Sequence, residues 1–157
     1  MSAIEATANP EIAERAATLL GGRKVLRRSV RSALQAHDLL VDGLPGEAVT
    51  HLFCNLTVLK MTGSLERAVG MSLRTFQRRK GVAVKPLNHE QSGRAWKFAE
   101  ILATASDVFG SQAEAEQWLE RPAMGLDGRR PIDLLATPAG VELVEEFLRR
   151  IEYGVYV

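Results

Sequence analysis

The sequence predicts an all-α protein, and three observations support that fold class. Aromatic residues make up 6% of the 157 residues, while alanine and leucine are abundant, a composition that favours helices. Apolar residues recur at spacings of three and four, the period of a helix with one buried face. Capping residues, prolines and glycines divide the chain into segments of helical length. No stretch has the pattern of a paired β-strand.

The first part of the chain predicts a series of helices. Asn9 and Pro10 are an N-cap and a first helical residue, and their helix is expected to end near Gly21. One basic helix should follow and end at Gly43, with these apolar positions: Val25, Leu26, Val30, Ala33 and Leu34. Pro45 opens another helix. Its expected buried face consists of Val49, Leu52, Phe53, Leu56 and Leu59.

Helices are also expected in the second part. Two capping boxes open a long helix and the one after it: Asn88 with Gln91, and Ser111 with Glu114. Gly110 ends the long helix and Pro122 the next. A turn at Gly128 leads into a short helix over 131–135, and Thr137 with Pro138 opens the last helix. Its apolar stripe is Val141, Val144, Leu148 and Ile151.

The charge distribution divides the chain into two parts. Residues 1–86 contain 13 Lys and Arg against 7 Asp and Glu, a net charge of +6, and residues 87–157 contain 7 against 12, a net charge of −5. Such a split suggests a basic half that faces a polyanion and an acidic half that faces something else. Chance variation in surface charge is the alternative. We expect a helical DNA-binding half over 1–86 and a second domain over 87–157.

The sequence offers no catalytic residue, metal ligand or cofactor motif. The histidines are scattered without metal spacing, and there is no phosphate-binding glycine loop or nucleophile elbow. Cys54 lies in an apolar stretch and is expected to be a small core residue. The uncharged run over 48–59 is too short to cross a bilayer, and no signal peptide is apparent. We therefore expect a cytoplasmic protein without a membrane partner.

A helix-turn-helix is predicted in the stretch SLERAVGMSLRTFQRRKG, which begins at Ser64. Leu65, Ala68 and Val69 give a short first helix its apolar side, and Gly70 permits the turn. Arg and Gln suit base edges in the major groove, and Arg, Lys and Thr suit phosphates. The expected DNA-binding residues are the N-cap Ser72 and the outward positions Arg74, Thr75, Gln77, Arg78, Arg79 and Lys80.

The last fifty residues resemble the toxin-binding domain of the Xre/MbcA/ParS-type antitoxins, and the segment before them resembles the helix-turn-helix half of the same proteins. The matching elements keep their order and spacing: Val108-Phe109-Gly110, Trp118-Leu119, Pro122, Gly128-Arg129, Pro131, Leu134-Leu135, Thr137, Gly140, Arg150-Ile151-Glu152 and Gly154. Asp127 departs from the pattern, because relatives often carry glycine there. Arg129 is expected to cap or brace neighbouring carbonyls rather than to contact a partner, and Trp118 to belong to the core.

The resemblance implies an antitoxin whose partner is a RES-domain toxin that destroys NAD. It also implies a homodimer that binds operator DNA of its own operon and blocks the toxin's active site with its C-terminal region. The expected toxin-binding residues are Arg150, Ile151, Glu152, Tyr153, Gly154, Val155, Tyr156 and Val157.

This tail supplies two rings, Tyr153 and Tyr156, and two anions, Glu152 and the terminal carboxylate, which suit a dinucleotide pocket. The alternative for the tail is that it folds back onto its own domain. The alternative for the whole protein is a stand-alone or ligand-responsive helix-turn-helix transcription regulator.

Overall fold

The computed structural model describes residues 10–72 and 86–154 of the chain. These residues form α-helices and two short 3-10 helices, without a β-strand among them. The fold class is all-α, as predicted. Pairing between extended residues in the described ranges is limited to one isolated bridge, between Ala123 and Arg129.

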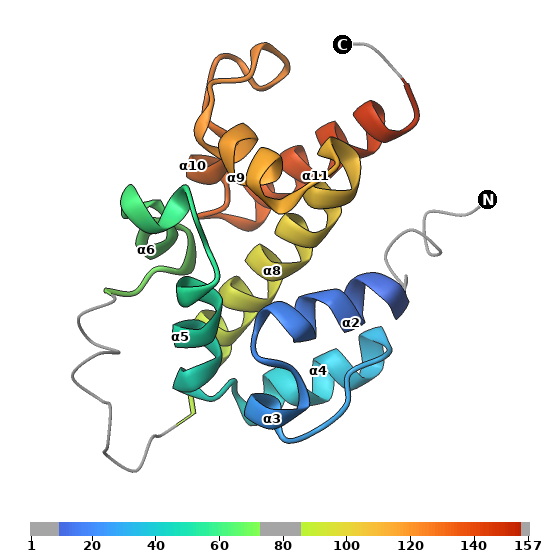
Figure 1. Ribbon diagram of the computed structural model, residues 1–157, viewed down its shortest axis with the longest axis vertical. Coiled ribbons are helices and arrows are strands. Elements are labelled where there is room, and N and C mark those ends of the chain that lie inside the picture. The colour runs from blue at the N-terminus through green and yellow to red at the C-terminus, as the bar shows by residue number, and fades with distance from the viewer. Residues whose placement is uncertain (1–9, 73–85, 155–157) are drawn as a thin grey trace.

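The long helix α8 (His89–Phe109) is the axis of the molecule and crosses its centre diagonally in Figure 1. It begins with the predicted capping box, in which the Asn88 side chain accepts the N–H of Gln91 at 2.8 Å and the Gln91 side chain accepts the N–H of Asn88 at 3.3 Å. It ends at Gly110, whose φ of 94° only glycine adopts readily. Its buried residues meet neighbours on both sides, so α8 organises the core.

Helices α2 (Pro10–Leu19), α3 (Gly22–Leu26) and α4 (Ala33–Asp42) precede α5 at one end of α8. The prediction of a single basic helix up to Gly43 was wrong, because the chain breaks between α3 and α4. Arg27 caps α3 in the left-handed region, with φ 60°, and the Ser32 side chain caps α4 by accepting the N–H of Gln35. Leu34 consequently faces outward and is 70% exposed.

The next segment contains α5 (Gly46–Cys54), the 3-10 helix η1 (Leu59–Met61) and α6 (Ser64–Val69). Leu52 is fully buried, and Phe53 packs against the core while partly exposed. Because α5 ends at Cys54, Leu56 and Leu59 reach the core from beyond the helix rather than from its face. The prediction that Cys54 is a core residue was also wrong: Cys54 is exposed at the end of α5.

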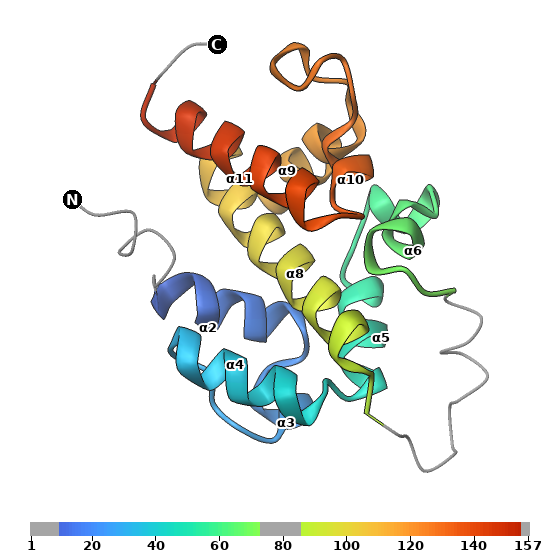
Figure 2. The same ribbon diagram turned by 180° about the vertical axis from the view of Figure 1, so that it is seen from behind.

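The last segment contains α9 (Gln112–Glu120), the 3-10 helix η2 (Met124–Leu126), α10 (Pro131–Leu134) and α11 (Pro138–Glu152). The side chains of Ser111 and Thr137 cap α9 and α11, as predicted. Val144 and Leu148 of α11 are fully buried, whereas Val141 is partly buried. These helices lie at the other end of α8 (Figures 1 and 2).

One hydrophobic core crosses the predicted boundary at residues 86 and 87. It contains residues from both sides, among them Leu20, Leu52, Leu102, Leu119 and Leu148. The two halves expected to bind different partners are therefore packed together, so their relative position is determined by contacts between them.

The described part of the chain contains no helix whose length and apolarity would let it cross a membrane.

Candidate partner-binding sites

The first helix of the predicted helix-turn-helix is present as α6. Leu65, Ala68 and Val69 are buried, and Gly70 ends the helix with φ 73°. Ser72 is exposed. The other expected DNA-binding residues, Arg74, Thr75, Gln77, Arg78, Arg79 and Lys80, lie outside the described residues.

Arg94 of α8 holds the end of α6. Its guanidinium donates hydrogen bonds to the carbonyl oxygens of Ala68 at 3.0 Å and Arg67 at 2.8 Å. A cation at these carbonyls satisfies acceptors that the helix leaves free and suits the negative end of the helix dipole. A Cβ at Gly70 would lie 2.2 Å from this guanidinium, so a larger residue would displace the end of the Arg94 side chain, and the left-handed backbone itself favours glycine. Arg94 therefore fixes the direction in which the chain leaves α6.

A polar ring joins the α6 region to α9 and α10. Thr62 donates to Glu120 at 2.8 Å, Glu120 pairs with Arg130 at 2.8 Å, and Arg130 holds Asp133 through two hydrogen bonds of 2.9 Å. Asp133 lies 4.0 Å from Arg67, which donates to Ser64 at 3.4 Å. The hydroxyl oxygen of Ser64 lies 3.1 Å from that of Thr62 and closes the ring. The ring connects the proposed DNA-binding and toxin-binding parts through side chains alone.

A buried carboxylate makes a second connection between the same parts. Glu116 of α9 is fully buried, and its oxygens accept the N–H groups of Thr57 at 2.9 Å and Leu59 at 3.1 Å. They also accept the Thr57 hydroxyl at 3.2 Å and the Gln112 amide at 3.0 Å. Four donors compensate the desolvation of the charge. Glu116 thus holds the connection between α5 and η1 against α9.

The aromatic residues of the last segment form a stack. Trp118 is partly buried, and its ring centroid lies 5.0 Å from that of Phe109 and 5.9 Å from that of Phe147, to which it is nearly parallel. Gly125 of η2 lies against Phe147, because a Cβ there would come within 2.2 Å of the ring. The stack fixes α9, α11 and the loop before α10 relative to one another, so Trp118 has the structural role predicted for it.

The backbone of the loop over 121–130 shows why relatives often carry glycine at the position of Asp127. Asp127 has φ 55°, in the left-handed region that glycine occupies without strain. The N–H groups of Ala123 and Gly128 bond to the carbonyl oxygens of Arg129 and Ala123 at 3.0 and 2.9 Å, respectively, which closes the turn. Arg129 itself is exposed, and Arg130, the next residue, is the arginine that braces α10. Arg130 does so through the carboxylates of Glu120 and Asp133 and not through carbonyls, so the expectation for Arg129 does not describe its neighbour either.

The expected toxin-binding residues begin in the last turn of α11. Arg150 pairs with Glu146 at 2.7 Å on the exposed side, and Ile151 is half-buried. Glu152 and Gly154 are exposed, and Tyr153 is 75% exposed. Gly154 has φ 70° and donates its N–H to the carbonyl of Ile151 at 3.1 Å, so the helix ends there. Val155, Tyr156 and Val157 lie outside the described residues.

Sequence reasoning missed Arg94, Glu116, Glu120 and the rest of the polar ring. One local signal was available, because Arg130 and Asp133 are three residues apart at a helix that begins with Pro131. The partners Glu120 and Thr62 give no such signal, since they meet Arg130 only through the fold. The described residues contain no group of three or more His, Cys, Asp or Glu that would suit a metal ion.

Comparison with known proteins connects this architecture to toxin binding. Residues 104–154, which include the aromatic stack and α11, match the Antitoxin Xre/MbcA/ParS C-terminal toxin-binding domain. An Antitoxin Xre of Pseudomonas putida is 33% identical over 123 residues, which are 78% of this chain and 74% of that protein. An Antitoxin Xre of Photorhabdus laumondii is 31% identical over 118 residues, 74% of this chain and 78% of that protein. A Prs ADP-ribosylating antitoxin of Sphingobium sp. is 30% identical over 81 residues, 46% of this chain and 51% of that protein.

The fold and these matches define an all-α antitoxin of a toxin–antitoxin pair, with a toxin-binding domain in its last third. The identity extends over most of the chain and not only over that domain. The chain belongs to the Xre antitoxin family.

Proposed function

We propose that the protein neutralises a RES-domain toxin that degrades NAD, by placing the chain from Arg150 onward in the toxin's active site. The observation that carries this proposal is the exposure of Tyr153. A tail that folded back onto its own domain would bury this ring, whereas Tyr153 is 75% exposed where α11 ends. Tyrosine is also well suited to interfaces, since its large rigid ring loses little conformational freedom on binding.

The position of the tail supports this mode of inhibition. Val144 and Leu148 anchor α11 in the core, so the residues that follow are held at a defined point and lose less freedom on docking. The pocket of an NAD-degrading enzyme must accept flat rings and a pyrophosphate. Tyr153 and Tyr156 provide rings and Glu152 provides an anion, so the tail can occupy such a pocket as a pseudo-ligand. The Sphingobium relative is named for ADP-ribosylation, a reaction that consumes NAD, and is compatible with such a partner.

We further propose that a homodimer of the protein binds operator DNA and represses its own operon. Helix α6, the turn at Gly70 and the hydrogen bonds from Arg94 to the end of α6 support this proposal, because they suit the first helix and turn of a helix-turn-helix. We place Arg74, Gln77 and Arg78 in the major groove and the remaining basic residues of the segment at phosphates. If both protomers of a dimer placed all four basic residues over 74–80 on phosphates, about eight contacts would give a slope near −7 for log affinity against log salt concentration. Because some of these residues read bases instead, we expect a slope of smaller magnitude.

The toxin part of the proposal is tested by co-expression with the neighbouring gene followed by a pull-down. The expected result is a stable complex with a RES-domain protein. An isolated gene, or an operon of metabolic genes whose small molecules change DNA affinity, would instead support the ligand-responsive regulator.

The DNA part is tested with the double variant Arg74→Ala, Arg78→Ala in a mobility-shift assay with the operon's promoter. We expect the variant to lose the shift and to retain toxin binding, because the toxin-binding domain is untouched. Full operator affinity in the double variant would show that these residues do not read the DNA.

A further inference from the structure

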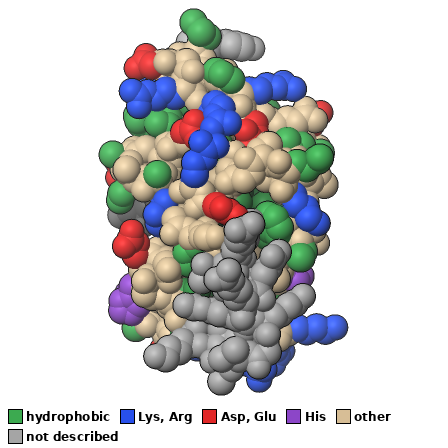
Figure 3. All heavy atoms as spheres, turned by 90° about the vertical axis from the view of Figure 1, so that its left-hand side faces the viewer, with side chains coloured by type: hydrophobic (Ala, Val, Ile, Leu, Met, Phe, Trp, Pro, Cys, Tyr) green, Lys and Arg blue, Asp and Glu red, His purple; other side chains and the backbone are tan. Residues whose placement is uncertain are grey.

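A second basic surface lies on α3, outside the predicted helix-turn-helix. Arg23 and Lys24 of α3 and its cap residue Arg27 are all exposed, whereas Leu26 is buried and Val25 packs against the core. Val25 and Leu26 thus hold α3 against the core, and the three basic side chains are on its solvent-exposed side. Lys and Arg side chains project from the lower end of the molecule in Figure 3, the end at which α3 lies in Figure 1.

The charges of these three side chains are not neutralised by acidic side chains among the described residues. Two neighbouring arginines have acidic partners: Arg28 pairs with Asp42 at 2.8 Å, and Arg31 lies 3.7 Å from Glu14. Arg23, Lys24 and Arg27 form no ion pair with any described residue. Three adjacent cations without internal partners repel one another, and this repulsion is relieved by a bound polyanion.

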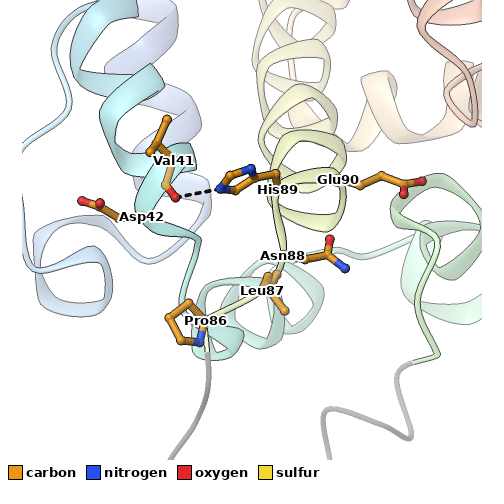
Figure 4. A pocket seen from close by; sticks show the side chains of 7 residues that line it. All are labelled: Val41, Asp42, Pro86, Leu87, Asn88, His89 and Glu90. Atoms are coloured by element: carbon orange, nitrogen blue, oxygen red, sulfur yellow. Dashed lines mark hydrogen bonds between the residues drawn. The ribbon is translucent and has the colours of Figure 1, made fainter.

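The surface lies beside the chain that returns from the predicted DNA-binding segment. The ion pair of Arg28 with Asp42 places the residue after Arg27 beside the end of α4. The next residue, Gly43, contacts Pro86, since a Cβ on Gly43 would lie 2.8 Å from the Pro86 Cβ. Figure 4 shows Asp42 and Pro86 around the same recess. The N–H of Leu87 also bonds to the carbonyl of Leu44 at 2.8 Å.

We propose that Arg23, Lys24 and Arg27 form a phosphate-binding surface for duplex DNA that flanks the sequence read by the helix-turn-helix. This inference rests on the proposed DNA binding and adds to it a contact that carries no sequence information. Phosphate contacts position a protein on the duplex, while base contacts select the sequence. The surface therefore contributes to the affinity for any DNA and to its dependence on salt.

The test is a triple variant, Arg23→Gln, Lys24→Gln and Arg27→Asn. Asparagine is chosen at position 27 because it tolerates the left-handed backbone that Arg27 adopts. The matched control removes three exposed basic side chains at the other end of the molecule: Arg121→Gln, Arg129→Gln and Arg149→Gln. The probes are a duplex of the operon's own promoter and a random duplex of equal length, titrated at several salt concentrations.

The triple variant is expected to bind both duplexes at least about tenfold more weakly at 0.15 M salt. The slope of its log affinity against log salt concentration should fall in magnitude by about 2.7 per bound protomer, for three lost phosphate contacts. The control should keep the wild-type slope. If the triple variant fails to melt like the wild type, Lys24→Gln alone, on the exposed side of α3, should lower the slope by about 0.9 per protomer.

Wild-type affinity and slope in the triple variant would overturn this inference and leave the proposed function intact. An equal loss in the control would also overturn it, because the effect would then be one of net charge. A triple variant that binds DNA normally but no longer captures the toxin would assign the surface to the toxin instead. Wild-type protein that binds neither duplex would overturn the DNA part of the proposed function together with this inference.

Discussion

Arg130 Nη1 lies 2.8 Å from Glu120 Oε2, and the two side chains are 28% and 14% exposed, respectively. The pair is thus more shielded from water than an ordinary surface ion pair. It joins the end of α9 to the start of α10, and Thr62 extends it to the segment that precedes α6. Hydrogen bonds from Arg130 to Asp133 complete the brace and raise the pKa of Arg130 above its ordinary value. The guanidinium is therefore held in its charged form beside the two carboxylates.

Removing this arginine should destabilise the protein more than removing an exposed one. Arg130→Ala leaves Glu120 largely buried without its counter-charge, and we expect a loss of about 1–3 kcal/mol in the free energy of unfolding. Arg150→Ala is the matched control, because its pair with Glu146 is 45% and 52% exposed and should contribute about 0.5 kcal/mol or less. Urea unfolding of both variants measures the difference. Equal losses would show that the Arg130 brace contributes no more than a surface pair.

The close packing of α11 against α10 depends on Gly140. A Cβ at this position would lie 1.9 Å from the carbonyl oxygen of Leu134 in α10, so Gly140→Ala must separate the two helices. We expect a loss of about 1–3 kcal/mol.

Gly93 of α8 provides the control for this substitution, since no atom lies within 4 Å of its Cβ position. Gly93→Ala should stabilise the protein by about 0.5–1 kcal/mol through helix propensity. Thermal melting of both variants compares them. A neutral Gly140→Ala would mean that α11 can shift away from α10 without loss.

Glu100 should make stability depend on pH. Burial raises the pKa of Glu100 above its ordinary value; the nearby charge of Lys97, at 3.4 Å, opposes this shift, and Glu145 adds to it. An acid with a raised pKa in the folded state binds more protons folded than unfolded. Its contribution to stability is therefore greatest at low pH and is lost as pH rises through the raised pKa.

The variant Glu100→Gln should show a smaller decrease in melting temperature between pH 5 and pH 8 than the wild type. Glu142→Gln, which removes an exposed acid of α11, controls for the loss of one negative charge. Melting curves at both pH values for the three proteins give the comparison. A Glu100→Gln profile that coincides with the wild-type profile would exclude Glu100 as a source of the pH dependence.

Local signals in the sequence account for most of the helices. The capping box at Asn88, the caps at Ser111 and Thr137 and the end at Gly110 need only a few adjacent residues, and all are present. The break between α3 and α4 was missed because it depends on Arg27 adopting a left-handed backbone, which a sequence pattern does not favour for arginine. The exposed position of Cys54 was missed because α5 ends there, so the apolar periodicity continues without the helix.

The candidate sites also contain some features that the sequence predicts and others that only the fold brings together. The position of the toxin-binding domain could be predicted from the order and spacing of its motif residues, including Gly140, which the contact with Leu134 explains. The connections between the two halves could not be predicted. Glu116 meets Thr57, and Glu120 meets Thr62, across more than fifty residues of chain. Only the packing of α9 against the segment before α6 brings these groups together.

The central claim is that the chain beyond Arg150 inhibits the toxin, and the most direct measurement is NAD consumption by purified toxin with a truncated antitoxin. The truncation ends the chain after Arg150, and the point variant Tyr153→Ala tests the exposed ring in the full chain without removing a buried group. Complex formation is followed separately by size-exclusion chromatography, because the rest of the domain can still bind.

NAD consumption should resume with the truncated protein even where a complex still forms, and Tyr153→Ala should weaken inhibition in the same direction. Full inhibition by a truncated protein that melts like the wild type would contradict the claim. The toxin would then be inhibited through another surface of the domain.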